Sequence, residues 1–201
     1  MAPRSDIEFR SHGTTLRGWL YRPESADGDV PLVVLAHGLG AVKEMRLDAF
    51  AARFAAAGIA ALVFDYRHFG ASDGTPRQLL SISRQLADWS AAIDYASTLD
   101  GIDPSRIALF GTSFSGGHVL QVAARDRRVA AVVSQCPFTD GPTSATTVGL
   151  RPLLGIAIRA GLDVGAAVLR RARGGPSPRP PARPRRVSMR TRAPPPANHH
   201  R

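Results

Sequence analysis

The sequence predicts an α/β fold with a mostly parallel central sheet and helices on both faces. Four short runs are almost entirely apolar, which is typical of strands buried on both faces of such a sheet. They span residues 32–36, 60–64, 107–110 and 129–133. The segments between them carry apolar residues every three or four positions, as amphipathic helices do. This alternation of strand and helix is that of a doubly wound fold.

An antiparallel hairpin is expected at the start, because two β-prone runs, 7–10 and 16–21, flank Gly13 and two threonines. Three helices should follow, the third directly after Ser113. Their inward residues are expected to be Leu47, Phe50, Ala51 and Phe54 in the first, Ile82, Leu86, Trp89 and Ile93 in the second, and Val119, Val122 and Ala123 in the third. The run 129–133 is the last predicted strand, so it should form an edge of the sheet.

Charge and proline divide the chain at residue 171. Residues 1–170 hold 17 basic and 16 acidic side chains, whereas residues 171–201 hold nine arginines, no acid and eight of the 16 prolines. Such a tail cannot bury enough apolar surface to fold, so we expect one domain over 1–170 and a disordered tail over 171–201. The net charge of +10 lies almost entirely in that tail, so we expect no nucleic-acid partner for the domain.

Two further features concern the end of this domain. Residues 146–170 are expected to be helical, because Leu150, Leu154, Ile158 and Leu162 recur at four-residue spacing. Beyond it, Arg, Pro, Ala and Gly dominate, and Arg outnumbers Lys 25 to 1 in the whole chain. A misread frame of GC-rich coding sequence has this composition, which makes a frameshift near residue 171 our hypothesis for the tail.

Cys136 is the only cysteine, which excludes an internal disulfide and a Cys-rich zinc site and fits a reducing compartment. Because it follows an apolar strand, we expect it to be a small buried hydrophobe. The first 20 residues lack the apolar core of a signal peptide, and the apolar stretch 153–169 is interrupted by Arg159 and Asp163. We therefore expect a cytoplasmic protein with no membrane span, no metal and no cofactor.

The clearest chemical signal is the segment GTSFSGG, where an apolar strand ends and a helix begins. A serine on such a tight turn presents its hydroxyl at the carboxyl edge of the sheet, and small neighbours let helix and strand approach. Ser113 is therefore the candidate nucleophile, and its small neighbours are Gly111, Ser115 and Gly116. The usual pattern is G-x-S-x-G, from which Ser115 departs. The alternative is a Gly/Ser turn that only caps a helix.

A second loop, HGLG, follows the first buried strand. Acyl transfer needs backbone N–H groups that converge on a developing oxyanion, one from the residue after the nucleophile and one from this early loop. Phe114 and Leu39 are the candidate donors. His37, Gly38 and Gly40 are expected to shape the loop, whose glycines allow close approach. A simple turn at the strand end is the alternative.

From Ile7 to Asp140 the chain resembles an α/β-hydrolase of the serine aminopeptidase and Xaa-Pro dipeptidyl-peptidase-like branch. The resemblance rests on the opening hairpin, on HGLG, on FDYRHFGASDG at 64–74, on GTSFSGG and on SQCPFTDG at 134–141. It implies that Ser113 attacks a small ester or amide substrate, and that the residues after it and after His-Gly form the oxyanion hole. The loop at 64–74 borders the site in the resembled family.

The fold also requires an acid and then a histidine after the nucleophile, on loops that follow later strands. No such strands are evident, so we expect a C-terminally truncated fold that lacks both partners. Activity should then be impaired, because a serine hydroxyl without a base is a weak nucleophile. His118 and Asp140 remain as candidates for base and acid, although an aspartate before glycine is typical of a turn. The competing hypothesis is a non-catalytic binding protein that engages an anionic partner through its basic tail.

Overall fold

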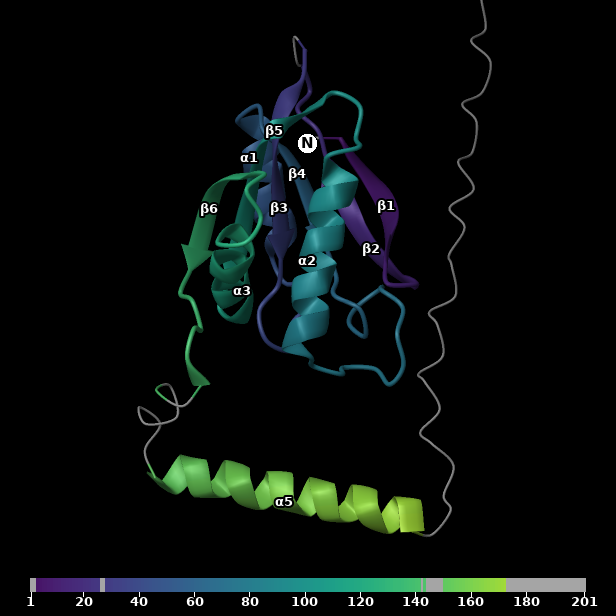
Figure 1. Cartoon of the computed structure of the whole chain (residues 1–201), viewed down its shortest axis with the longest axis vertical. Helices are drawn as coiled ribbons and strands as arrows, with labels where there is room; N and C mark the ends of the chain where they lie inside the picture. The colour runs from purple at the N-terminus through teal and green to yellow at the C-terminus, as the bar shows by residue number, and fades with distance from the viewer. Residues whose placement is uncertain (1–2, 26–27, 142, 144–149, 173–201) are drawn as a thin grey trace, which may run out of the picture.

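The computed structural model describes residues 3–25, 28–141, 143 and 150–172, in which a six-stranded sheet carries helices on both faces (Figure 1). The strand order is β1-β2-β4-β3-β5-β6. The strands are β1 Arg4–Ser11, β2 Thr14–Tyr21, β3 Val30–Ala36, β4 Ala60–Phe64, β5 Ile102–Thr112 and β6 Val129–Gln135. The last four strands run parallel to one another, and the β1–β2 hairpin pairs antiparallel with β4. The predicted α/β fold with an antiparallel opening hairpin is confirmed.

The hairpin closes through a two-residue turn, in which His12 and Gly13 have positive φ angles of 45° and 82°. Positive φ at both central residues matches the right-handed twist of the flanking strands, and glycine adopts it without a steric penalty. At the junction with β4, a Cβ on Gly18 would lie 2.2 Å from the carbonyl oxygen of Val63. Glycine therefore allows the hairpin to pair closely with the parallel part of the sheet.

Helices cover both faces of the parallel strands. α1, Leu47–Ala56, packs on one face through Leu47, Ala51 and Ala55. α2, Ile82–Ala96, and α3, Phe114–Ala123, pack on the other face, where they share a larger core. Fully buried members of that core include Leu32, Val34, Leu62, Trp89, Ile93 and Leu109. Burial on both faces explains why β3 and β4 have nearly continuous apolar sequences.

Two helical positions differ from the sequence expectation. Phe50 and Ile82, expected to face inward, are 38% and 53% exposed. Ile82 is the first residue of α2, so no preceding helical turn covers it. The ring centroids of Phe50 and Phe110 are 4.9 Å apart, but the buried residues of α1 are Leu47, Ala51 and Ala55. The spacing of apolar residues thus predicts where each helix lies, but not which of its apolar side chains are buried.

β6 also differs from the expectation of a strand buried on both faces. Ala130, Ala131 and Val133 are exposed. In the described part of the chain, β6 pairs only with β5, and α3 packs against it. An edge strand with this limited cover leaves much of its apolar surface in contact with solvent.

α5, Leu150–Ala172, occupies most of the segment 146–170 for which a helix is expected, and it continues two residues beyond. It lies apart from the sheet (Figure 1), and its side chains Leu154, Ile158 and Leu162 are exposed. Residues 144–149 and the Arg/Pro-rich tail from residue 173 lie outside the described residues. Within the described residues, no helix combines the length and the apolar character needed to cross a membrane.

Candidate active site

Ser113 occupies the turn between β5 and α3 with an unusual backbone. Its φ and ψ are 55° and −115°, a conformation that non-glycine residues keep only where the surrounding structure imposes it. Two hydrogen bonds do so: Ser113 N–H donates to Gln135 O, and Phe138 N–H donates to Ser113 O, both at 2.9 Å. The residue is exposed, so its hydroxyl is open to a ligand.

The small residues around this turn are required by close backbone approach. A Cβ on Gly111 would lie 2.2 Å from Ser115 O, and one on Gly116 would lie 3.0 Å from Pro137 Cα. Ser134 Oγ donates a further hydrogen bond to Gly116 O at 2.8 Å. The first turn of α3 is therefore packed tightly between β5 and the segment after β6.

The loop after β3 lies against Ser113. A Cβ on Gly38 would be only 3.1 Å from Ser113 Cβ. His37 is buried, and its Nδ1 donates a hydrogen bond to Gly38 O at 3.0 Å. Because the C=O and N–H of a trans peptide point in opposite directions, this bond turns the N–H of Leu39 away from His37. The Leu39 side chain is exposed, and Gly40 follows with a φ of 65°.

The protonation of His37 follows from its contacts. A carbonyl oxygen only accepts, so Nδ1 carries the proton that bonds Gly38 O. Burial lowers the pKa of His37, which favours the neutral ring. Within the described residues, Nε2 is buried without a hydrogen-bond partner, 3.7 Å from Asp65 Oδ1. In a neutral His37, the unprotonated Nε2 and the carboxylate of Asp65 are therefore two hydrogen-bond acceptors that face each other.

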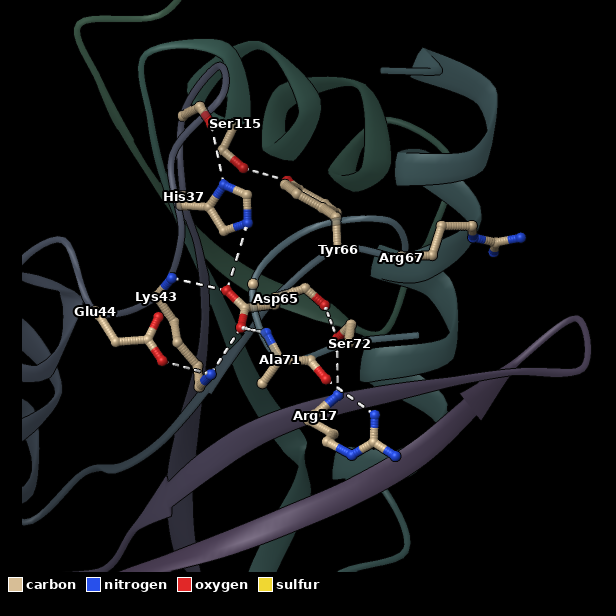
Figure 2. A network of polar contacts seen from close by, with 12 residues as sticks. Arg17, His37, Lys43, Glu44, Asp65, Tyr66, Arg67, Ala71, Ser72 and Ser115 are labelled. Atoms are coloured by element: carbon tan, nitrogen blue, oxygen red, sulfur yellow. Dashed lines mark hydrogen bonds and ion pairs between the residues drawn. The ribbon is translucent and has the colours of Figure 1, made fainter. Parts of the chain in front are cut away.

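Asp65, at the end of β4, connects the two loops that border the site (Figure 2). Its fully buried carboxylate accepts hydrogen bonds from Lys43 N–H at 2.8 Å, from Lys43 Nζ at 2.7 Å and from Ala71 N–H at 2.9 Å. Gly70 leaves space for it, since a Cβ there would lie 2.2 Å from Asp65 Oδ2. Burial lowers the pKa of Lys43, but the charge and hydrogen bond of Asp65 outweigh this and the net shift is upward.

A second buried ion pair joins the loop after β4 to α2. Arg67 Nε and Nη2 donate to Asp88 Oδ1 at 2.8 and 2.6 Å, and Arg67 N–H donates to Asp88 Oδ2 at 3.0 Å. Nη2 also donates to Ser11 Oγ at the end of β1. The loop that borders the site is therefore tied to the hairpin, to α2 and to the loop after β3.

Lys43, Tyr66 and Asp88 have no role that is expected from the sequence. Two of them carry a signal that could have drawn attention. Lys43 is the only lysine of the chain, and Asp88 interrupts the apolar face of α2 next to Trp89. Tyr66 carries no such signal, because a tyrosine beside a buried strand is an ordinary core residue.

The remaining candidates have hydrogen-bond partners other than Ser113. His118 is buried, its Nε2 donates to Gln85 Oε1 at 2.9 Å, and burial lowers its pKa to about 4. Asp140 Oδ1 accepts from Thr143 N–H at 2.9 Å, as a turn aspartate does. Cys136 is exposed rather than buried, because the chain turns there with a φ of 46° at the end of an edge strand.

Two absences apply to the described residues alone. No side chain there forms a hydrogen bond with Ser113 Oγ. Nor do those residues contain a group of three or more His, Cys, Asp or Glu side chains placed to hold a metal ion. The site is therefore a serine on a strained turn beside a glycine loop.

Comparison with known proteins places the chain in a family. Residues 12–184 match the family described as X-Pro dipeptidyl-peptidase (S15 family). The quorum-quenching protein AidA of Acinetobacter baumannii is 54% identical over 157 residues, which are 77% of this chain and 51% of that protein. A thiohydrolase of Eupenicillium brefeldianum is 37% identical over 140 residues, which are 69% of this chain and 44% of the thiohydrolase.

A solved structure shows the same fold. The α/β hydrolase GrgF from a Penicillium species superposes with a TM-score of 0.66 and 33% identity, over 81% of this chain and 56% of GrgF. The chain spans about half the length of the curated relatives it matches. By its sequence match and its fold, the chain belongs to the X-Pro dipeptidyl-peptidase (S15) family of α/β hydrolases.

Proposed function

We propose that this chain carries the nucleophile and the oxyanion hole of a serine hydrolase that cleaves ester or amide bonds. The observation that supports this most strongly is the backbone of Ser113. A positive φ of 55° on an exposed serine between a parallel strand and a helix is the geometry of a nucleophile elbow. The glycine loop after β3, in contact with Ser113, supplies the second half of the site.

The proposed reaction starts with attack of Ser113 Oγ on the substrate carbonyl carbon. As the new C–O bond forms, the carbonyl electron pair moves to its oxygen, and the N–H groups of Leu39 and Phe114 donate to that oxyanion. The serine proton passes to a base, which returns it to the leaving oxygen or nitrogen as the tetrahedral species collapses and expels the alcohol or amine. Water then releases the acyl group from Ser113 by the same two steps.

The rate that we expect from this chain depends on the group that accepts the serine proton. His118 donates to Gln85, and its lowered pKa makes it a poor proton acceptor. Without a base that activates the serine, an oxyanion hole and substrate binding alone give a rate enhancement on the order of 10³ to 10⁴ over the reaction in water. We therefore propose weak turnover. Because some relatives are named thiohydrolases, esters with a thiol leaving group belong among the substrates tested.

Covalent labelling tests this proposal. A p-nitrophenyl phosphonate should phosphonylate Ser113, seen as one added group by intact mass and located by peptide mapping. Ser113→Ala should abolish the adduct, while Ser90→Ala, which removes an exposed serine hydroxyl from α2, should leave it unchanged. An adduct at another residue, or an equal adduct in Ser113→Ala, would refute the nucleophile.

The second candidate function is a non-catalytic binding protein that holds a ligand at the same serine. It is favoured by one observation: within the described residues, no side chain bonds Ser113 Oγ. A binding protein predicts no phosphonate adduct under any condition, whereas a hydrolase with a slow base predicts a slow adduct. The labelling time course therefore separates the two functions.

A further inference from the structure

Three buried polar side chains form a chain of hydrogen bonds next to Ser113. Trp89 lies in α2, Tyr66 follows β4, and Ser115 lies in the first turn of α3, and each is at most 1% exposed. Trp89 Nε1 donates a hydrogen bond to Tyr66 Oη at 2.7 Å. Figure 2 shows the second bond, between Tyr66 Oη and Ser115 Oγ. Three separate elements thus meet through two hydrogen bonds in the core.

The direction of the first bond follows from the groups themselves. An indole N–H only donates, so Tyr66 Oη accepts from Trp89. The hydroxyl hydrogen of Tyr66 is then available to donate to Ser115 Oγ. Burial raises the pKa of Tyr66, so the hydroxyl keeps this hydrogen at neutral pH. Tyr66 Oη therefore joins Trp89 to Ser115, and either hydroxyl can be the donor in the second bond.

Ser115 is the residue at which this sequence departs from the G-x-S-x-G pattern. Its side chain makes a contact that a glycine could not make. Its carbonyl packs so closely on Gly111 that a Cβ there would approach to 2.2 Å. Its side chain is bonded by Tyr66 on the other side. Ser115 is therefore fixed on both sides, one residue away from Phe114 and two from the strained Ser113.

We propose that Tyr66 is a positioning residue that acts through Ser115 to fix the direction of the Phe114 N–H in the oxyanion hole. This inference rests on the proposed function, which assigns that N–H its role. Gln135 and Phe138 hold Ser113 by its backbone, and Tyr66 holds the residue that follows Phe114. Together these contacts determine the peptide that joins Ser113 to Phe114.

Two variants remove opposite ends of the same bond. Tyr66→Phe and Ser115→Ala should each lower the rate constant for phosphonate labelling of Ser113 about tenfold, as partial loss of one oxyanion donor would. The double variant should be no slower than either single variant, since both remove one interaction. Tyr95→Phe, the same substitution on a half-buried α2 residue whose ring stacks on Phe9, should label at the wild-type rate.

Stability distinguishes positioning from a general structural role. Tyr66→Phe leaves the buried Trp89 N–H without its partner, whereas Ser115→Ala does not, so the urea midpoint should fall more in Tyr66→Phe. Positioning predicts equal losses of reactivity despite these unequal losses of stability. Losses of reactivity that follow the urea midpoints, or that add in the double variant, would overturn the inference.

A measurement independent of reactivity keeps the two proposals separate. The ¹H–¹⁵N amide resonance of Phe114 should shift in Tyr66→Phe and in Ser115→Ala, and it should not shift in Tyr95→Phe. If wild-type protein takes up no phosphonate, the proposed function fails and this resonance alone decides the positioning inference. An unchanged Phe114 resonance in both variants would overturn it.

Discussion

At the scale of single residues, the backbone of Ser113 and its contact with Gly38 carry the functional argument. A serine keeps a positive φ only where its surroundings impose it. At Ser113, the backbone hydrogen bonds with Gln135 and Phe138 do so. Gly38 lies so close to Ser113 that a side chain at position 38 would press against the serine. The site is thus defined by backbone geometry, which a few atoms of added volume can disturb.

Gly38→Ala tests this dependence on volume. The new Cβ would lie 3.1 Å from Ser113 Cβ and 3.2 Å from Thr112 O, so the loop after β3 must move away. We expect the phosphonate labelling rate to fall about 10- to 100-fold, since displacement of an oxyanion donor has effects of this order. The urea midpoint reports whether the fold survives. Labelling at the wild-type rate would contradict the placement of the oxyanion hole.

A second prediction at this scale concerns acid. The pKa of His118 is about 4 in the folded chain, below the ordinary value near 6.5 for an unfolded histidine. Between these values the unfolded state binds more protons, so the free energy of unfolding falls as pH drops from about 6.5 to about 4. Urea midpoints at pH 7.5 and pH 4.5 should therefore differ less in His118→Asn than in wild type. The exposed turn variant His12→Asn should keep the wild-type difference.

At the scale of elements, sequence periodicity predicts the strands and helices but not the polar contacts that join them. The bounds of β4 equal those of the predicted run 60–64, and α3 begins directly after Ser113 as expected. The sequence predicts β6 as an edge strand, but an apolar run does not tell which of its residues are exposed. Lys43–Asp65 and Tyr66–Ser115 pair residues 22 and 49 positions apart, which no local pattern reveals.

The buried ion pair Arg67–Asp88 gives a prediction at this scale. Asp88→Asn should leave the buried guanidinium without its counter-charge and lower the free energy of unfolding by roughly 3–5 kcal/mol. Asp94→Asn, on the same helix, removes an exposed partner of Arg128 and should cost less than about 1 kcal/mol. Urea unfolding of both variants measures the difference. Equal effects would show that the pair does not tie α2 to the loop after β4.

At the scale of the whole molecule, the sheet and α5 differ in how they present apolar surface. In the described residues, β6 has one paired neighbour and an exposed Val133, and α5 exposes several large apolar side chains. Free strand edges of this kind offer unpaired backbone groups to a second chain. Self-association at high concentration is therefore the expected behaviour of this chain.

Val133→Lys should reduce that self-association, because a charge on an edge strand opposes pairing with another edge. Sedimentation velocity at increasing protein concentration measures the effect. Leu120→Lys, at a similarly exposed apolar position on α3, should change it less, since a helix offers no unpaired strand edge. A wild-type chain that remains a single monomeric species at high concentration would contradict the prediction.

Attack of Ser113 on a carbonyl carbon should leave an acyl group on its side-chain oxygen. After brief exposure to p-nitrophenyl acetate and an acid quench, peptide mapping should find one acetyl group, on Ser113, with weak subsequent turnover. Ser113→Ala should carry no acetyl group there and should release p-nitrophenol at the background rate. Acetylation confined to other residues, or hydrolysis that Ser113→Ala leaves unchanged, would contradict the account.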